Sequence, residues 1–361
     1  MPRILSGVQP TGNTHIGNYV GAFRQWVEMQ HEFDAYYCVV DLHAITLPYD
    51  AGELRARTLE VAALLLACGL DPEVCTVFVQ SHVPEHTELA WLLNHLATVG
   101  ELRRMTQFKV KAAEGGEGAL PAGYFNYPVL QAADILIYQA DRVPVGEDQR
   151  QHLELTRDVA ERFNARFGQT FTVPEAYIPK VGGRVMDLQI PEAKMSKSST
   201  SSNGRIEVLD PPEVIRRKIR SAVTDSGREV VARPDKAAIS NLLELFSVAS
   251  SRSVGELEQA YAGRGYGDFK ADLADAVVAY LAPVQDRYHG LRDDPGHLAG
   301  ILEAGAAKAQ AVARANLALA KERMGFLPRG PEGSGRGGPG DPTGVPRTVG
   351  HQRGAPVGRQ R

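Results

Sequence analysis

The sequence predicts an α/β fold in which helices cover a parallel sheet, followed by a second region made only of helices. Two observations support this prediction. Between residues 1 and 205, short apolar runs alternate with stretches whose apolar residues recur at helical spacing. After residue 206 only the helical pattern continues. Strands that alternate with helices are typical of a parallel sheet, because each strand needs a crossover connection to reach the next.

The first strand is expected at Ile4, where a short apolar segment runs into a turn rich in serine, glycine, proline and threonine. Val20, Phe23 and Val27 then mark the apolar face of a helix. A junction of this kind presents free backbone N–H groups and the positive end of a helix dipole, which suit a phosphate. Most such turns bind nothing, so a simple tight turn remains an alternative.

The other elements of this first region follow in order. Strands are expected over residues 35–40, 76–80 and 143–145, and helices over residues 53–68, 85–98, 129–139 and 147–167. The run at 35–40 is apolar throughout, as expected of a strand buried on both faces. Gly69 is expected to follow the end of a helix, and the glycine-rich residues 114–123 are expected to form a surface loop. These elements predict a Rossmann-like, doubly wound parallel sheet.

The second region, residues 206–327, is expected to be entirely helical. Its helices are predicted over residues 211–222, 239–249, 254–262, 271–288 and 298–324. Residues 328–361 are dominated by glycine, proline and arginine and are expected to form a disordered tail. The tail contains a formal GxGxxG match at residues 333–338, but no strand precedes it and no helix follows it, so a nucleotide site is not expected there.

Composition narrows the class of protein. The chain has 361 residues, of which 43% are hydrophobic and 23% charged, which is ordinary for a globular enzyme of two domains. No apolar run is long enough to cross a bilayer, so a cytoplasmic protein without a membrane partner is expected. The three cysteines, Cys38, Cys68 and Cys75, form no CxxC pair and indicate neither a disulfide framework nor a zinc site.

The charge is unevenly distributed. The formal charge of −3 includes a net +4 in residues 328–361, with six arginines against two acidic residues, which leaves −7 on residues 1–327. A nucleic-acid partner would therefore need a local basic face rather than an attractive overall field.

A polar, serine-rich loop at residues 194–204 contains two lysines that flank a serine, Lys194 and Lys197. Such a loop can close over a polyphosphate and neutralise the charge that develops on a leaving group. The alternative is a solvated basic loop.

These two stretches carry a resemblance. Thr14-His15-Ile16-Gly17-Asn18 and Lys194-Met195-Ser196-Lys197-Ser198 resemble the HIGH and KMSKS signatures of class I aminoacyl-tRNA synthetases. Residues 6–19, 41–46, 100–111, 132–136 and 143–149 resemble the bacterial tryptophanyl-tRNA synthetases, and the similarity runs from about residue 4 to about residue 328. The resemblance implies a catalytic domain at 1–205, an anticodon-binding helical region at 206–327 and a homodimer. It also implies L-tryptophan, ATP and tRNA(Trp) as substrates.

The resemblance implies an ATP site and its catalytic residues. Members of the ATP site would be Gln9, Pro10, Thr11, Gly17, Asn18, Gln107, Gly146, Glu147, Asp148, Val185, Lys194, Met195, Ser196, Lys197 and Ser198. His15, Lys194, Lys197 and Lys111 would face the phosphates, although a solvated helix face is an alternative for Lys111. Mg²⁺ is inferred from the chemistry of ATP, because no protein metal cage is visible in the sequence.

The resemblance also implies a tryptophan pocket, formed by Leu5, Gln9, His43, Tyr127, Gln131, Asp134, Val143, Val145 and Gln149. Asp134 would accept the indole N–H, since indole offers only a donor. Without the resemblance, a lone acid on an apolar helix more often caps or pairs structurally. Leu5 and Gln131 replace the aromatic residue and the methionine common in the family, and Ser199-Thr200 replaces its frequent Asp-Pro.

The function expected is ATP-dependent activation of tryptophan and its transfer to tRNA(Trp), by a tryptophan–tRNA ligase. Three alternatives remain open from the sequence. They are a tyrosine-specific sister enzyme, an RNA-binding or regulatory paralogue without activation activity, and a general nucleotidyltransferase of the same fold. The intact Lys194–Ser198 segment and His15 argue against a protein that only binds RNA.

Overall fold

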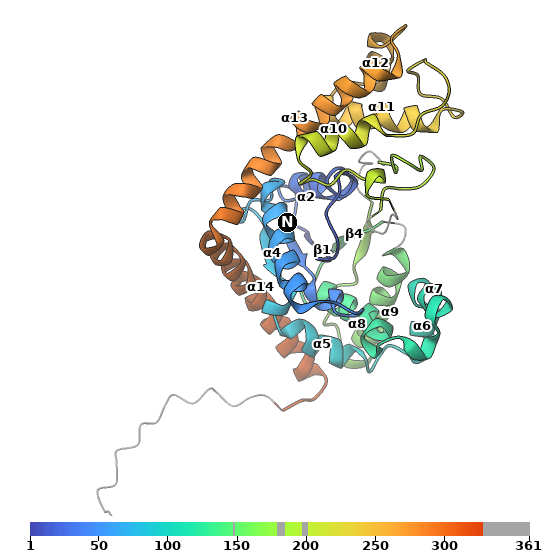
Figure 1. The fold of residues 1–361 in the computed structure, drawn as a ribbon. Coiled ribbons are helices and arrows are strands. Elements are labelled where there is room, and N and C mark those ends of the chain that lie inside the picture. Colours follow the sequence, from blue (N-terminus) through green and yellow to red (C-terminus); the bar gives the residue numbers. More distant parts are fainter. Residues whose placement is uncertain (147–148, 179–184, 197–200, 328–361) are drawn as a thin grey trace, which may run out of the picture.

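The computed structural model describes residues 1–146, 149–178, 185–196 and 201–327 (Figure 1). At its centre lies a five-stranded parallel sheet with the strand order β3-β2-β1-β4-β5. The strands are β1 (Arg3–Val8), β2 (Asp34–Val39), β3 (Thr76–Val79), β4 (Arg142–Pro144) and β5 (Glu175–Tyr177). The chain moves outward from β1 to β3 and then returns to the other side of β1, which confirms the doubly wound sheet.

The described residues contain fourteen α-helices. They are α1 (Ile16–Asn18), α2 (Arg24–Met29), α3 (Asp41–Ala44), α4 (Ala51–Ala67), α5 (Glu85–Leu93), α6 (Val99–Arg104), α7 (Thr106–Gly115), α8 (Ala122–Leu136), α9 (Arg150–Phe167), α10 (Pro212–Arg220), α11 (Ala237–Ser250), α12 (Val254–Ala260), α13 (Tyr266–Asp293) and α14 (Pro295–Arg323). A π-helical turn at Tyr19–Phe23 joins α1 to α2. Among these residues, no helix is long and apolar enough to cross a membrane.

Two apolar layers cover the faces of the sheet because side chains alternate along each strand. On β1 and β2, Ile4 and Tyr37 face a core that includes residues of α2, α4, α11 and α13. Leu5 and Tyr36 face the opposite core, which is formed with α5, α8, α9 and α14. Strands buried on both faces account for the continuous apolar run at residues 35–40.

Local signals set several element boundaries. Asp50 caps α4 by accepting a hydrogen bond from the backbone N–H of Glu53, 2.8 Å away. Gly69 follows that helix with φ +117°, a left-handed conformation that glycine adopts without strain. The expected position of Gly69 after the helix end is therefore confirmed.

Two local predictions were wrong, and one strand was not predicted. The helix expected over 85–98 ends at Leu93, because Thr98 instead caps α6 in a reciprocal pair with Glu101. The loop expected at 114–123 is shorter, since α7 continues to Gly115 and α8 already begins at Ala122. Strand β5 was not predicted, because its three residues form no apolar run.

The helical character of residues 206–327 is confirmed, since their only β-structure is an isolated bridge of Glu207 to His15. Figure 1 shows α13 leading from α11 and α12 back toward the sheet. There α14 packs against β3 and α5. A Cβ atom added to Gly305 would clash with the carbonyl oxygen of Val77, so α14 rests directly on the strand backbone. The last helix thus covers the central sheet, and the domain boundary at 205/206 stays a prediction.

Candidate active site

A cavity of about 590 Å³ opens at the carboxyl ends of β1 and β4, where the strand order reverses. Ligands of doubly wound sheets bind at this kind of switch point. All nine residues expected in the tryptophan pocket line the cavity: Leu5, Gln9, His43, Tyr127, Gln131, Asp134, Val143, Val145 and Gln149. Gln107, expected in the ATP site, lines the same cavity. The structure brings these side chains together, and their individual roles stay predictions.

Helix α8 supplies the polar side of this cavity. Tyr127, Gln131 and Asp134 are spaced four and three residues apart, so they share one helix face. The hydroxyl of Tyr127 lies 2.9 Å from Nε2 of His152, and burial raises the pKa of this phenol, which therefore stays protonated. Gln131 donates to Oε1 of Gln149 at 3.4 Å. The cavity therefore has an amide and hydroxyl side, while Leu5, Val143 and Val145 supply apolar walls.

Asp134 is the buried charge of the cavity, with 4% of its surface exposed. Its Oδ2 lies 2.7 Å from Nε2 of His43, and its Oδ1 lies 2.6 Å from Nδ1 of His86 and 2.8 Å from Nε2 of Gln80. Burial by itself would raise the pKa of Asp134, but the charge interactions and hydrogen bonds of His43 and His86 outweigh it and hold that pKa below its usual value. The carboxylate is therefore an acceptor at neutral pH.

Sequence reasoning missed the residues behind Asp134. Gln80, His86 and Tyr138 are fully buried and do not line the cavity, yet Gln80 and His86 contact the carboxylate directly. The position of Gln80 was the available signal, since a polar residue that ends an apolar strand lies at the edge where ligands bind.

The loop of the HIGH-like signature forms the second part of the site. His15 is 3% exposed and caps α1, where Oδ1 of Asn18 accepts from its backbone N–H at 3.2 Å. Gly17 leaves room for the imidazole, because a Cβ there would lie 2.9 Å from Nδ1 of His15. The glycine expected to admit a nucleotide therefore also makes space for the histidine beside it.

The second signature packs against the first. A Cβ on Gly17 would lie 3.7 Å from Cβ of Met195, whose backbone N–H donates to Val185 at 3.2 Å. Met195 is buried, whereas Lys194 is exposed and pairs with Met186 in an isolated antiparallel bridge. The structure thus places Val185 and Met195 beside the His15 loop. Lys197, Ser198, Glu147 and Asp148 lie outside the described residues, so the structure does not place them.

Residues 206–210 hold the HIGH-like loop from the other side. The backbone N–H of Ile16 donates to Ile206 at 2.8 Å, and that of Val208 donates to Thr14 at 2.9 Å. Asp210 in turn accepts from Lys218 of α10 at 2.6 Å, an ion pair that is buried. Helix α10 therefore anchors the loop through Asp210.

Several predicted site residues lie away from the cavity. Lys111 does not line it, and its ammonium bonds Oε2 of Glu114 at 2.8 Å, which raises the pKa of Lys111. Pro10 is buried, whereas Thr11 and Gly146 are exposed, and Ser196 is half-buried. None of these four lines the cavity. The described residues contain no group of three or more His, Cys, Asp or Glu side chains arranged to hold a metal ion.

Comparison with known proteins assigns this geometry to a family. The family model described as class I tRNA synthetases (W and Y) matches residues 1–282. Tryptophan–tRNA ligase 2 of Streptomyces avermitilis is 56% identical over 331 residues, covering 91% of this chain and 98% of that protein. The tryptophanyl-tRNA synthetase structure from Mycoplasma pneumoniae is 37% identical with a TM-score of 0.81, covering 91% of this chain and 98% of that one.

A further solved structure, the Campylobacter jejuni tryptophanyl-tRNA synthetase with ADP and tryptophan, is 35% identical with a TM-score of 0.79. That alignment covers 90% of this chain and 100% of the other. These similarities confirm the resemblance seen in the sequence. The three relatives described here are bacterial enzymes for tryptophan, and the chain belongs to the class I tRNA synthetase family of the tryptophan and tyrosine enzymes.

Proposed function

We propose that the protein activates L-tryptophan with ATP, releases pyrophosphate and transfers tryptophan to the 3′-terminal adenosine of tRNA(Trp). The observation that carries this proposal is a buried carboxylate, Asp134, in a cavity with apolar walls. An indole fits this combination, because it presents a large apolar ring and a single N–H donor. Family membership supports the reaction type, and the cytoplasm is the compartment we propose for it.

The reaction needs no protein nucleophile and depends mainly on how the two substrates are positioned. The tryptophan carboxylate attacks the α-phosphorus of ATP and pyrophosphate leaves, so the site must hold both reactants in line and neutralise the phosphates. Tyr127 and Gln149 are proposed to hold the α-amino group at the polar side of the cavity. His15, Lys194 and Lys197 are proposed to face the phosphates. Mg²⁺ is proposed to be bound mainly by the ATP phosphates and water, which suits described residues without a metal cage.

Amino-acid-dependent ATP–pyrophosphate exchange tests this function. Purified protein is assayed with tryptophan, tyrosine, phenylalanine or no amino acid, and exchange is expected with tryptophan alone. Exchange with tyrosine would assign the protein to the sister activity and would implicate Leu5 and Gln131 in the change of pocket. Exchange without any amino acid would indicate a general nucleotidyltransferase, and the absence of exchange would favour the regulatory alternative.

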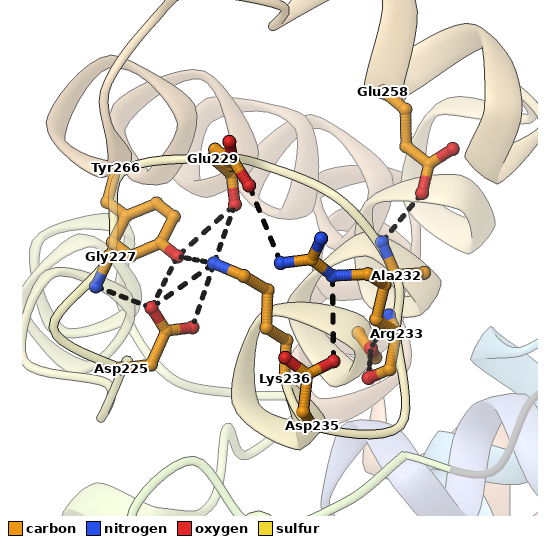
Figure 2. Close-up of polar contacts among 10 residues, drawn as sticks. Asp225, Gly227, Glu229, Ala232, Arg233, Asp235, Lys236, Glu258 and Tyr266 are labelled. Carbon is orange, nitrogen blue, oxygen red and sulfur yellow. Dashed lines mark hydrogen bonds and ion pairs between the residues drawn. The ribbon is translucent and has the colours of Figure 1, made fainter.

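We further propose that the helical region at 206–327 contacts the anticodon part of the tRNA. A second cavity of about 590 Å³ in this region is lined by three arginines, Arg228, Arg233 and Arg264, and by two acidic residues, Glu229 and Glu258. Figure 2 shows how the loop beside this cavity is fixed. The buried ammonium of Lys236 lies 2.9 Å from the hydroxyl of Tyr266 and 3.3 Å from a carboxylate oxygen of Asp225. A fixed loop that carries exposed arginines suits an RNA backbone.

Arg228 is the arginine of this loop chosen for the test, because it is exposed and forms no ion pair with any residue in the described ranges. Arg228→Glu is expected to lower kcat/KM for tRNA about tenfold in aminoacylation, through lost attraction and added repulsion of phosphate. Pyrophosphate exchange should be unchanged. Arg55→Glu, the same charge change on an exposed position of α4, serves as the control. Equal charging by both variants would argue against this surface.

We also propose that the protein is a homodimer. Trp91 of α5 is 77% exposed, and Val99 nearby in sequence is 57% exposed. Large exposed apolar side chains are typical of interfaces, where aromatic residues are enriched.

Trp91→Asp is expected to shift sedimentation from dimer to monomer, because a desolvated carboxylate would be placed in the contact. Val223→Asp, a change at an exposed position that lies after α10, should not alter sedimentation. A wild-type protein that sediments as a monomer would contradict the proposal.

A further inference from the structure

The carboxylate of Asp134 is held by two buried side chains that do not line the cavity. Gln80, at the end of β3, and His86, on α5, are both fully buried and absent from the cavity lining. Nε2 of Gln80 lies 2.8 Å and Nδ1 of His86 lies 2.6 Å from the same oxygen, Oδ1. Two donors, one that follows β3 and one on α5, therefore converge on one carboxylate oxygen of α8.

The orientation of Gln80 follows from its second contact. Its Oε1 accepts from the backbone N–H of Leu42 at 3.1 Å, so the amide nitrogen is the group that faces Asp134. Leu42 precedes His43, whose ring lines the cavity and contacts Oδ2 at 2.7 Å. Gln80 thus connects the buried side of the carboxylate to the α3 backbone that carries the cavity-side histidine.

The tautomer of His86 is fixed in the same way. An ionised carboxylate only accepts, so Nδ1 of His86 must carry a proton. Nε2 of a neutral ring is then an acceptor, and the hydroxyl of Tyr138 donates to it at 2.7 Å. Burial raises the pKa of Tyr138, which keeps that proton in place. The chain from Tyr138 through His86 to Asp134 satisfies every polar atom of the imidazole.

This arrangement leaves one acceptor direction on the carboxylate. Each carboxylate oxygen has about two lone-pair sites. Oδ1 uses both for Gln80 and His86, whereas Oδ2 uses one for His43. The remaining site belongs to Oδ2, the oxygen on the side of the cavity-lining histidine.

We propose that Gln80 and His86 are positioning residues that keep Asp134 ionised with a single open acceptor site, and so make the cavity select a ring that carries an N–H. The inference rests on the proposed function and deepens it, because it names what sets the choice between an indole and an equally large ring without the donor. A site with an unmet buried acceptor penalises the ring that lacks the donor.

The charge of Asp134 depends on groups from several elements. His43 of α3, His86 of α5, Cys38 of β2 and Tyr138 after α8 surround it. Removing the His86 donor raises the pKa of Asp134, because burial is then opposed by fewer interactions. Asp134 would then begin to protonate as the pH falls, and the preference for an N–H would weaken on the acidic side.

The test compares tryptophan with β-(benzothiophen-3-yl)alanine, which has sulfur in place of the indole N–H, in pyrophosphate exchange. The quantity compared is kcat/KM for tryptophan divided by kcat/KM for the analogue. For His86→Leu, this ratio is expected to fall about tenfold, and to fall further as the pH is lowered. KM for ATP should stay within about twofold. His86→Asn returns an amide donor near the position of Nδ1 and should restore most of the ratio. His95→Leu, the same change at an exposed histidine after α5, is the control.

Gln80→Met provides a second route if His86→Leu does not fold, since it keeps the side-chain shape and removes the donor. It is expected to lower the ratio in the same direction. A ratio unchanged in the folded variants, or a parallel loss for both amino acids and ATP, would overturn the inference and leave the proposed function standing. Absence of tryptophan-dependent exchange in the wild type would overturn the proposed function itself.

Discussion

Asp134→Ala is expected to lower kcat/KM for tryptophan about 10³-fold in pyrophosphate exchange while KM for ATP stays within about twofold. The change removes the acceptor proposed for the indole and also leaves the donors of His43, His86 and Gln80 without their common partner. Each unpaired buried group costs about 1–3 kcal/mol, and about 1.4 kcal/mol corresponds to a factor of ten in rate. KM for ATP is expected to change little, because the loop that carries His15 is held by residues 206–208 and not by Asp134.

Asp134→Asn tests the effect of the negative charge separately from the effect of side-chain size. It keeps the volume and one acceptor oxygen, so an intermediate loss of about 10- to 100-fold is expected. Steady-state exchange with tryptophan and ATP varied independently measures both effects. Equal losses for tryptophan and ATP would show that Asp134 supports the fold of the whole site, and the assignment of Asp134 to the indole would then be wrong.

Gly17→Val is expected to reduce kcat for exchange at least about 100-fold without weakening tryptophan binding. Even a Cβ at this position would lie 2.9 Å from Nδ1 of His15 and 3.7 Å from Cβ of Met195. The imidazole is buried, so it cannot move aside into solvent, and the two signature segments would be pushed apart. Misplacing reacting groups by about 1 Å can cost 100-fold in rate.

Gly21→Val is the matched control for this change. Gly21 lies in the π-helical turn Tyr19–Phe23 that directly follows α1, but a Cβ there meets nothing within 4 Å. Exchange kinetics and tryptophan binding by equilibrium dialysis are measured for both variants. Normal exchange by Gly17→Val would show that the packing of His15 against Gly17 does not matter for activation.

The parts of the fold that the sequence predicted are those in which one strong signal determines the structure. The run at 35–40 is apolar because β2 is buried on both faces, and Gly69 adopts the left-handed conformation that ends α4. Strand β5 has no such signal, because it is short and partly exposed at the edge of the sheet. The capping pair of Thr98 and Glu101 is visible in the sequence, but the periodic apolar pattern continues across it and predicts a single helix.

In the candidate site, too, some residues could be predicted from the sequence and others could not. Resemblance to a family supplied the cavity-lining residues, including Asp134 and His43. It did not supply Gln80 and His86, which lie 54 and 48 residues away from Asp134 in the sequence. Their role depends on which strand end and helix meet behind the carboxylate. That proximity is set by the strand order of the sheet, and local periodicity contains no information about it.

The packing of α14 on β3 has a consequence for how the protein is made. Gly305 rests on the backbone of Val77, so the strand is covered by a helix that is synthesised more than 200 residues later. At about 5–20 residues per second, a ribosome needs at least about ten seconds to add that helix. During this interval the nascent chain exposes apolar surface on β3 and α5. A partly synthesised copy therefore carries an uncovered apolar strand, a surface prone to aggregation, until α14 packs on it.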